Sequence, residues 1–220
     1  DQAIDSLQRR IDGWAAGLLL ARLSLGQTSE PEAAVAGIAG SNRLIADYIM
    51  EEVVSVQSET VKKQLAASSL LERFCSPLLD SVFSSFDENA DGERFIDHLE
   101  RTGLFLNSLD SSSTWYQYHH LFRQFLQDKF INRELPNSIR QEVHRLAGEW
   151  FAGRSLVEEA LDHFICAGSL DRAAELVLSN LDASIDQDFS CRSLASLLAR
   201  FTPETVVSRP ALLVAQGHVK

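Results

Sequence analysis

The stretch that decides the fold runs Leu104-Phe-Leu-Asn-Ser-Leu109, then Asp110-Ser-Ser-Ser-Thr114, then Trp115-Tyr-Gln-Tyr-His119. In its first and last parts, apolar and polar residues alternate with a period of about 2, as in a half-buried strand. The polar run between them is typical of a turn. The stretch therefore predicts a β-hairpin with aromatic-rich strands over 104–109 and 115–119.

Helical periodicity surrounds this hairpin. Before it we expect a helix over 58–74, a second from Ser76-Pro77 to 86, and a third that is closed by Gly103. After it, one helical face carries Leu121, Phe122, Phe125, Leu126 and Phe130. Three helices followed by a hairpin is the order of a winged-helix domain, which we place at 58–134.

The flanking segments are also predicted to be helical, so the fold class is mainly α. Residues 1–57 would form a helical domain, with helices over 2–25, 29–38 and 44–56. Residues 135–220 would form a helical arm leading into repeats, with helices near 138–152, 156–166, 170–181 and 189–200 and another starting at Thr202-Pro203. Ser155-Leu156-x-x-x-Ala160 recurs as Ser169-Leu170-x-x-x-Ala174. The recurrence suggests tetratricopeptide-like (TPR-like) repeats, with an irregular bundle as the alternative.

Composition argues against nucleic-acid and membrane partners. The 220 residues include 31 Asp and Glu against 20 Lys and Arg, a formal net charge of -11. Such a chain repels phosphate. The predicted third helix, where a DNA-reading winged helix would place its base contacts, carries Glu93, Arg94, Asp97, Glu100 and Arg101. The hairpin turn has Asp110 and neither Lys nor Arg, so we expect this winged helix to dock on protein.

The ends and the cysteines indicate the context. The chain begins and stops next to helical or apolar patterns, and Met50 is its only methionine. We therefore expect an internal fragment of a longer polypeptide. Its longest apolar run, 14–21, is shorter than the ~20 residues that span a bilayer. Cys75, Cys166 and Cys191 lie far apart, as expected of buried reduced thiols in a cytosolic protein.

No catalytic or metal-binding motif stands out. The sequence has no Gly-x-x-x-x-Gly-Lys-Ser/Thr loop, no Gly-x-Gly-x-x-Gly and no His-Glu-x-x-His. We predict no catalytic residues and no metal ligands, and we interpret Glu51-Glu52 and Glu158-Glu159 as solvated helix faces. His119-His120 lies where the second strand meets the next helix. Its imidazoles could meet a ligand there, although spacing alone favours a partly buried, hydrogen-bonded histidine.

Several motifs along the chain resemble a known family. Leu99-Glu-Arg-Thr-Gly-Leu-Phe-Leu106 and Trp115-Tyr-Gln-Tyr-His-His-Leu-Phe-Arg-Gln-Phe-Leu126 resemble the MalT-like large ATP-binding regulators of the LuxR class. Gly13-Trp-Ala-Ala-Gly-Leu18 is similar to the motif that follows their nucleotide-binding domain. Glu149-Trp150 and Glu159-Ala-Leu-Asp-His163 are similar to the arm after their winged helix. The resemblance covers nearly the whole chain.

The resemblance implies an internal piece of a STAND-type signal-transduction ATPase. In such proteins a nucleotide-binding core precedes a helical domain, a winged helix, a sensor of repeats and a DNA-binding domain. The implied partners are the chain's own nucleotide-binding and sensor domains, with DNA contacted only through a domain absent here and ligand-driven self-association in the whole protein. The fragment itself would hold no cofactor and catalyse nothing. ATP or ADP, slow ATPase activity and a cytoplasmic location are implied for the full-length protein.

The resemblance also implies a role for one histidine. In related switch ATPases a Met-His-Asp motif places its histidine on the β-phosphate of ADP. Tyr118-His119-His120 stands at that place, so His119 would contact an ADP phosphate held by the missing domain, while Tyr118 and His120 depart from the motif. The implied function is a regulatory segment that couples nucleotide state to effector sensing. The alternative is a helical adaptor that binds a protein partner without nucleotide.

Overall fold

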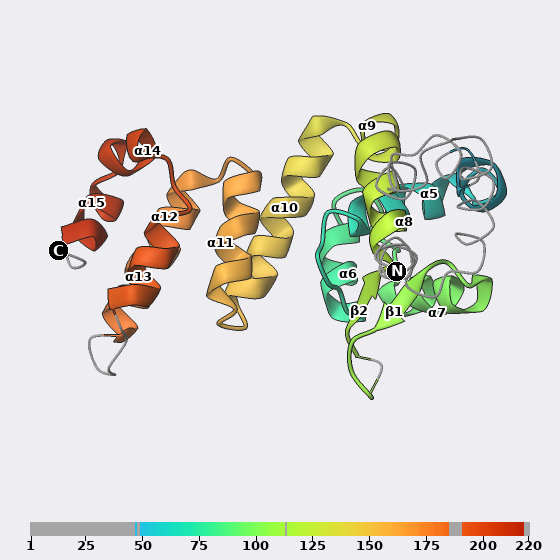
Figure 1. Ribbon diagram of the computed structural model, residues 1–220, viewed down its shortest axis with the longest axis horizontal. Coiled ribbons are helices and arrows are strands. Elements are labelled where there is room, and N and C mark those ends of the chain that lie inside the picture. The colour runs from blue at the N-terminus through green and yellow to red at the C-terminus, as the bar shows by residue number, and fades with distance from the viewer. Residues whose placement is uncertain (1–46, 48, 113, 185–190, 218–220) are drawn as a thin grey trace, which may run out of the picture. The chain divides into compact units, whose positions relative to one another are not determined.

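The structure is a computed structural model that describes residues 47, 49–112, 114–184 and 191–217. The predicted helices over 2–25 and 29–38, and the motif at 13–18, lie outside these residues. The described chain is mainly helical with a single small hairpin, as predicted (Figure 1). It forms two compact units. One comprises residues up to Leu79 together with Asp91–Pro136, and the other comprises Asp80–Ala90 together with residues from Asn137 onward.

The first unit contains the hairpin. Its elements are η1 (Ile49–Val54), α5 (Glu59–Ser68), α7 (Gly92–Thr102), β1 (Leu106–Ser108), β2 (Tyr116–Tyr118), α8 (His120–Phe125), η2 (Leu126–Phe130) and α9 (Ile131–Glu134). The helix α6 (Ser76–Phe83) lies across the boundary between the units. It starts at Ser76, as predicted, and ends at Phe83, three residues before the predicted end.

Local signals set the ends of α7. The side chain of Asp91 accepts a hydrogen bond from the Arg94 N–H at 3.0 Å, which satisfies one of the free donors of the first turn. Gly103 ends the helix with a φ of 64°, in the left-handed region that glycine adopts without steric cost. This confirms the predicted helix and its terminal glycine.

The hairpin is antiparallel and pairs Leu106 with Tyr118, Asn107 with Gln117 and Ser108 with Tyr116. Its strands are shorter than predicted. Phe105 has a φ of 50°, which interrupts the extended backbone, and His119 already caps the next helix.

The predicted helix over 58–74 ends early, at Ser68, so that part of the prediction is wrong. The hydroxyls of Ser68 and Ser69 donate to carbonyls of the preceding turn, Gln64 and Ala66, which weakens helix continuation. Phe74 then exchanges two backbone hydrogen bonds of 2.8 Å with Tyr116. A segment predicted as helix thus lies along the outer edge of β2.

Aromatic rings form the core of the first unit. The ring centroids of Phe74 and Tyr118 lie 5.1 Å apart, those of Tyr118 and Phe122 lie 5.3 Å apart, and those of Phe105 and Phe122 lie 4.9 Å apart. Aromatic pairs at such distances stabilise a core beyond the apolar area they bury. They fix the start of α8 against the hairpin.

The second unit is a series of helices. They are α10 (Asn137–Ala152), α11 (Val157–Cys166), α12 (Leu170–Ser184), α13 (Cys191–Leu198), α14 (Pro203–Ser208) and α15 (Pro210–Gly217). These bounds lie within a few residues of the prediction, and Thr202 caps α14 through the Thr205 N–H. One expectation is wrong: Cys166 is exposed on α11, whereas Cys75, in the first unit, is buried.

Three ion pairs of the second unit each link a helix, or the residues just after it, to the helix two places earlier in the chain. Arg172 of α12 pairs with Glu149 of α10 at 2.7 Å. Arg200, just after α13, pairs with Glu158 of α11 at 2.9 Å. Arg209, the C-cap of α14, pairs with Asp171 of α12 at 3.0 Å. We call these the arginine ladder. Stacked helical repeats place alternate helices side by side in this way, although TPR-like repeats remain a prediction.

Candidate functional site

The predicted site residue, His119, lies between β2 and α8 and is only 5% exposed. Its backbone N–H donates to the Phe105 carbonyl at 2.7 Å. Its Nδ1 accepts from the Leu121 N–H at 3.3 Å, so the imidazole acts as the N-cap of α8. Because Nδ1 accepts, a neutral ring carries its proton on Nε2.

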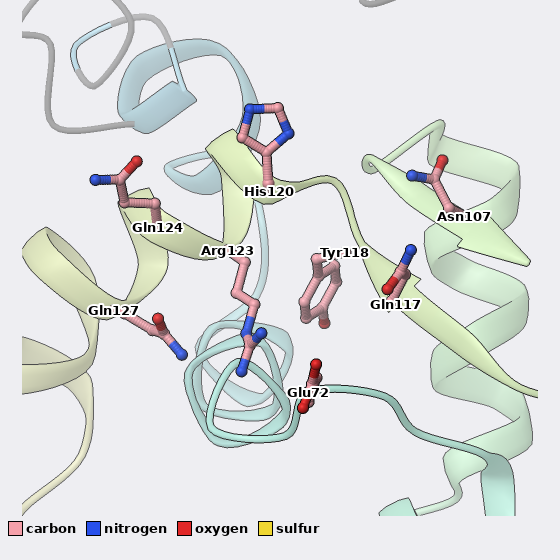
Figure 2. A pocket seen from close by; sticks show the side chains of 8 residues that line it. All are labelled: Glu72, Asn107, Gln117, Tyr118, His120, Arg123, Gln124 and Gln127. Carbon is pink, nitrogen blue, oxygen red and sulfur yellow. The ribbon is translucent and has the colours of Figure 1, made fainter. Parts of the chain in front are cut away.

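The neighbouring histidine faces outward. His120 is exposed, and its ring centroid lies 4.5 Å from that of His119. Figure 2 shows His120 at the rim of a polar hollow of about 300 Å³. The hollow is lined by Glu72, Asn107, Gln117, Tyr118, His120, Arg123, Gln124 and Gln127.

Three segments of the first unit build this hollow. His120, Arg123, Gln124 and Gln127 follow one another at i, i+3, i+4 and i+7, so α8 and η2 turn one polar face toward it. The hairpin supplies a second wall, where the register pairs Asn107 with Gln117. Glu72 comes from the segment after α5 (Figure 2).

The end of α5 holds one wall in place. The Ser69 carbonyl, at the C-terminus of α5, accepts from Gln127 Nε2 at 2.7 Å and from Arg123 Nε at 3.4 Å. A cation near a helix C-terminus is stabilised by the helix dipole. Arg123 is therefore held by its Nε edge, and the two terminal nitrogens of its guanidinium make no hydrogen bond within the part of the chain that the structure describes.

Tyr118 gives the hollow an uncharged wall. Its hydroxyl lies 2.6 Å from Ser68 Oγ, and burial raises the pKa of Tyr118 well above its usual value. The phenol therefore stays neutral at any physiological pH.

The lining of the hollow combines carboxamide, imidazole, guanidinium, phenol and carboxylate groups. Among the described residues, no group of at least three His, Cys, Asp or Glu side chains could hold a metal ion. Glu51 and Glu52 are exposed, as predicted, and Glu158 is paired with Arg200. No helix in the described ranges is long and apolar enough to cross a membrane.

A second titratable pair lies in the other unit. The Nδ1 atoms of His144 on α10 and His163 on α11 lie 2.9 Å apart, and the His163 ring stacks on Phe151. Burial, with the nearby charge of Arg140 as a smaller cause, lowers the pKa of His144 to about 4. The sequence gives no signal for this pair, because its members lie on different helices.

Both arginines of α7 have a carboxylate partner nearby in the sequence. Arg94 lies 3.2 Å from a carboxylate oxygen of Asp91, and Arg101 lies 3.4 Å from one of Asp97. In the hairpin turn, Asp110 accepts a hydrogen bond from the Thr114 N–H at 2.7 Å.

Comparison with known proteins identifies the central segment. Residues 50–138 match the family described as the MalT winged helix domain. The chain is 29% identical over 213 residues to the serine/threonine-protein kinase PknK of Mycobacterium tuberculosis. The aligned region covers 96% of this chain and 18% of PknK. It is 31% identical over 212 residues to the HTH-type transcriptional regulator MalT of Klebsiella pneumoniae. That aligned region covers 94% of this chain and 22% of the regulator.

A further relative is MalT of Cronobacter sakazakii, 28% identical over 214 residues and 94% of this chain. The chain spans only about a fifth of the length of these relatives.

Proposed function

Because residues 50–138 belong to the MalT winged helix domain family and the whole chain is MalT-like, we propose that it is an internal regulatory segment of an ATP-dependent transcriptional activator. In this proposal the segment couples nucleotide state to effector sensing. Its partners are the protein's own nucleotide-binding and sensor domains, and DNA is contacted by another domain. ATP or ADP binds outside this segment, in the cytoplasm.

The charge distribution supports a winged helix that docks on protein and not on DNA. DNA-reading surfaces are basic, because phosphate contacts dominate their affinity. Here the arginines of α7 are paired with carboxylates, Glu93 and Glu100 are exposed, and the chain carries a net charge of -11.

The relatives support the same interpretation. The segment recurs in proteins named as a kinase and as a transcriptional regulator. A role common to both is better explained by a relay between domains than by reading DNA.

The observation that carries the nucleotide proposal is the position of His119. Its Nδ1 accepts a hydrogen bond from the Leu121 N–H, so a neutral ring carries its proton on Nε2. An imidazole N–H fixed in direction by a helix cap can donate a charge-assisted hydrogen bond to a phosphate. His119 would then act as a latch that holds the winged helix on the ADP-bound domain.

Two substitutions separate the cap from the latch. His119→Asn keeps an oxygen that can accept the Leu121 N–H, because asparagine is among the best N-caps, whereas His119→Ala removes cap and imidazole together. In the full-length protein we expect both variants to release ADP faster and to raise basal activation. Only His119→Ala should also lose about 1 kcal/mol of stability.

The measurement is retention of radiolabelled ADP after gel filtration, with urea unfolding of the same samples. His120→Ala is the matched control, since His120 is exposed and does not cap the helix. If His119→Asn retains ADP as well as the parent protein, the latch is wrong and His119 serves only as a cap.

The second candidate function is a regulatory region of a protein kinase. It is favoured by the similarity to PknK, which extends over 96% of this chain. Reading the gene that encodes the chain decides between the two. A kinase catalytic domain in the same reading frame would support this candidate, and a DNA-binding helix-turn-helix would support the activator.

A further inference from the structure

We propose that the polar hollow beside α8 binds a small zwitterion of the amino-acid class. Arg123 would take the carboxylate, Glu72 the ammonium, and the surrounding amides the side chain. The proposal does not depend on nucleotide binding or on the latch.

Arg123 is prepared for a carboxylate. Its Nε donates a long hydrogen bond of 3.4 Å to the Ser69 carbonyl, so this edge of the guanidinium is turned toward the end of α5. Both terminal nitrogens are without a hydrogen bond in the described structure, although Arg123 lines the hollow and is only partly exposed. Paired guanidinium N–H groups match the two oxygens of a carboxylate.

Glu72 supplies the opposite charge from a different segment. Its carboxylate makes no ion pair or hydrogen bond with any described residue, Arg123 included. Figure 2 shows Glu72 and Arg123 both extending into the space below Tyr118. An acid and a base that line one hollow without pairing can be bridged by a molecule that carries both charges.

The remaining lining suits a polar ligand body. Asn107, Gln117, Gln124 and Gln127 bring carboxamides from both walls. A carboxamide offers donors and acceptors together, so it can bind hydroxyl, amide or amine groups. A volume of about 300 Å³ is at the lower end of the range for small-molecule sites, which limits the ligand to a small molecule.

Charge favours a zwitterion over a phosphate. The chain carries a net charge of -11, and Glu72 stands at the site itself. Both repel a dianion. A zwitterion has no net charge, and each of its ends meets a complementary group.

The test is titration calorimetry of the 220-residue chain with each of the standard free amino acids. We expect at least one to bind with a dissociation constant of about 0.1–1 mM. Its N-acetyl and methyl-ester derivatives should each bind at least about tenfold more weakly, because each lacks one charge. Phosphate and ADP should not compete.

Variants identify the site. Glu72→Gln should weaken binding about tenfold while leaving the thermal unfolding curve unchanged, since Glu72 has no partner among the described residues. Glu93→Gln, an equal change of charge at an exposed position of α7, is the matched control and should bind like the parent chain. Arg123→Lys should bind weakly, because lysine cannot make the paired contact.

Three outcomes would overturn the proposal. The first is that no amino acid binds. The second is that the blocked derivatives bind as tightly as the free amino acid. The third is that Glu72→Gln and Glu93→Gln weaken binding equally. None of these outcomes bears on ADP retention by the full-length protein, so the site and the latch can fail separately.

Discussion

The hydroxyl of Tyr118 donates a hydrogen bond of 2.6 Å to Ser68 Oγ, with both side chains buried. The direction follows from the second bond of Ser68, whose only proton goes to the Gln64 carbonyl at 2.7 Å. The pair joins the hairpin to the last turn of α5.

The two single substitutions of this pair should differ in cost. Ser68→Ala leaves a buried phenol without an acceptor, at a cost of about 1–3 kcal/mol, whereas Tyr118→Phe leaves only an unused lone pair and costs less. The double variant should lose less stability than the sum of the two single variants. Urea unfolding of all four proteins measures this coupling. Additive losses would mean that the hydroxyls do not interact.

A second prediction concerns the close approach of α10 and α11. A Cβ at Gly148 would lie 2.7 Å from two ring carbons of Phe164, which is buried. Gly148→Ala should therefore destabilise the chain by about 1–3 kcal/mol, despite alanine's higher helix propensity. Gly153→Ala is the control, because the nearest atom to its Cβ is at 3.4 Å. A melting temperature for Gly148→Ala equal to that of the control would contradict the packing.

A third prediction concerns the arginine ladder. Arg200 is 26% exposed and reaches both Glu158 and Asp162 on α11. Arg200→Gln should cost about 0.5–1 kcal/mol in dilute buffer, and the loss should shrink in molar salt as the charges are screened. Arg94, which is 87% exposed and paired with Asp91 at the start of its own helix, provides the control, and Arg94→Gln should change stability less. A loss that is independent of salt would assign Arg200 a packing role instead.

A fourth prediction concerns pH. His144 has a pKa of about 4 in the folded chain, against its ordinary value of 6.5. As the pH falls, His144 is therefore protonated at a higher pH in the unfolded chain than in the folded chain. The contribution of His144 to stability is complete above about pH 6.5 and is lost as the pH falls toward 4, by roughly 1–3 kcal/mol in all.

Chemical unfolding at a series of pH values between about 7 and 4 would show this loss. His144→Gln should flatten the dependence, and His120→Gln, at an exposed position, should not. If the free energy of unfolding of the His144→Gln protein fell equally steeply with pH, the titrating group would be a residue other than His144.

Much of the fold could be predicted because its signals are local. Gly103 marks the end of α7, and alternation marks the hairpin. The end of α5 could not be predicted in this way. The segment after it pairs with β2 through Phe74 and Tyr116, which lie far apart in the sequence. Helical periodicity reports only on neighbouring residues, so it cannot indicate such a pairing.

The geometry of the candidate site could be predicted only in part. The sequence places His119-His120 where a strand meets a helix, but nothing in it shows that His119 turns inward and His120 outward. From the sequence alone, the polar residues from His120 to Gln127 could equally form a solvent-exposed helix face or line a binding site. Only the approach of Glu72 and the hairpin makes it one wall of a hollow.

The contact between Gly148 and Phe164 also sets a rule for relatives of this chain. A ring at position 164 leaves no room for a side chain at 148, so the two positions should vary together. Where a relative carries a larger residue at the first position, we expect a smaller one at the second. Such compensated pairs would report, from sequences alone, which relatives keep the same distance between these two helices.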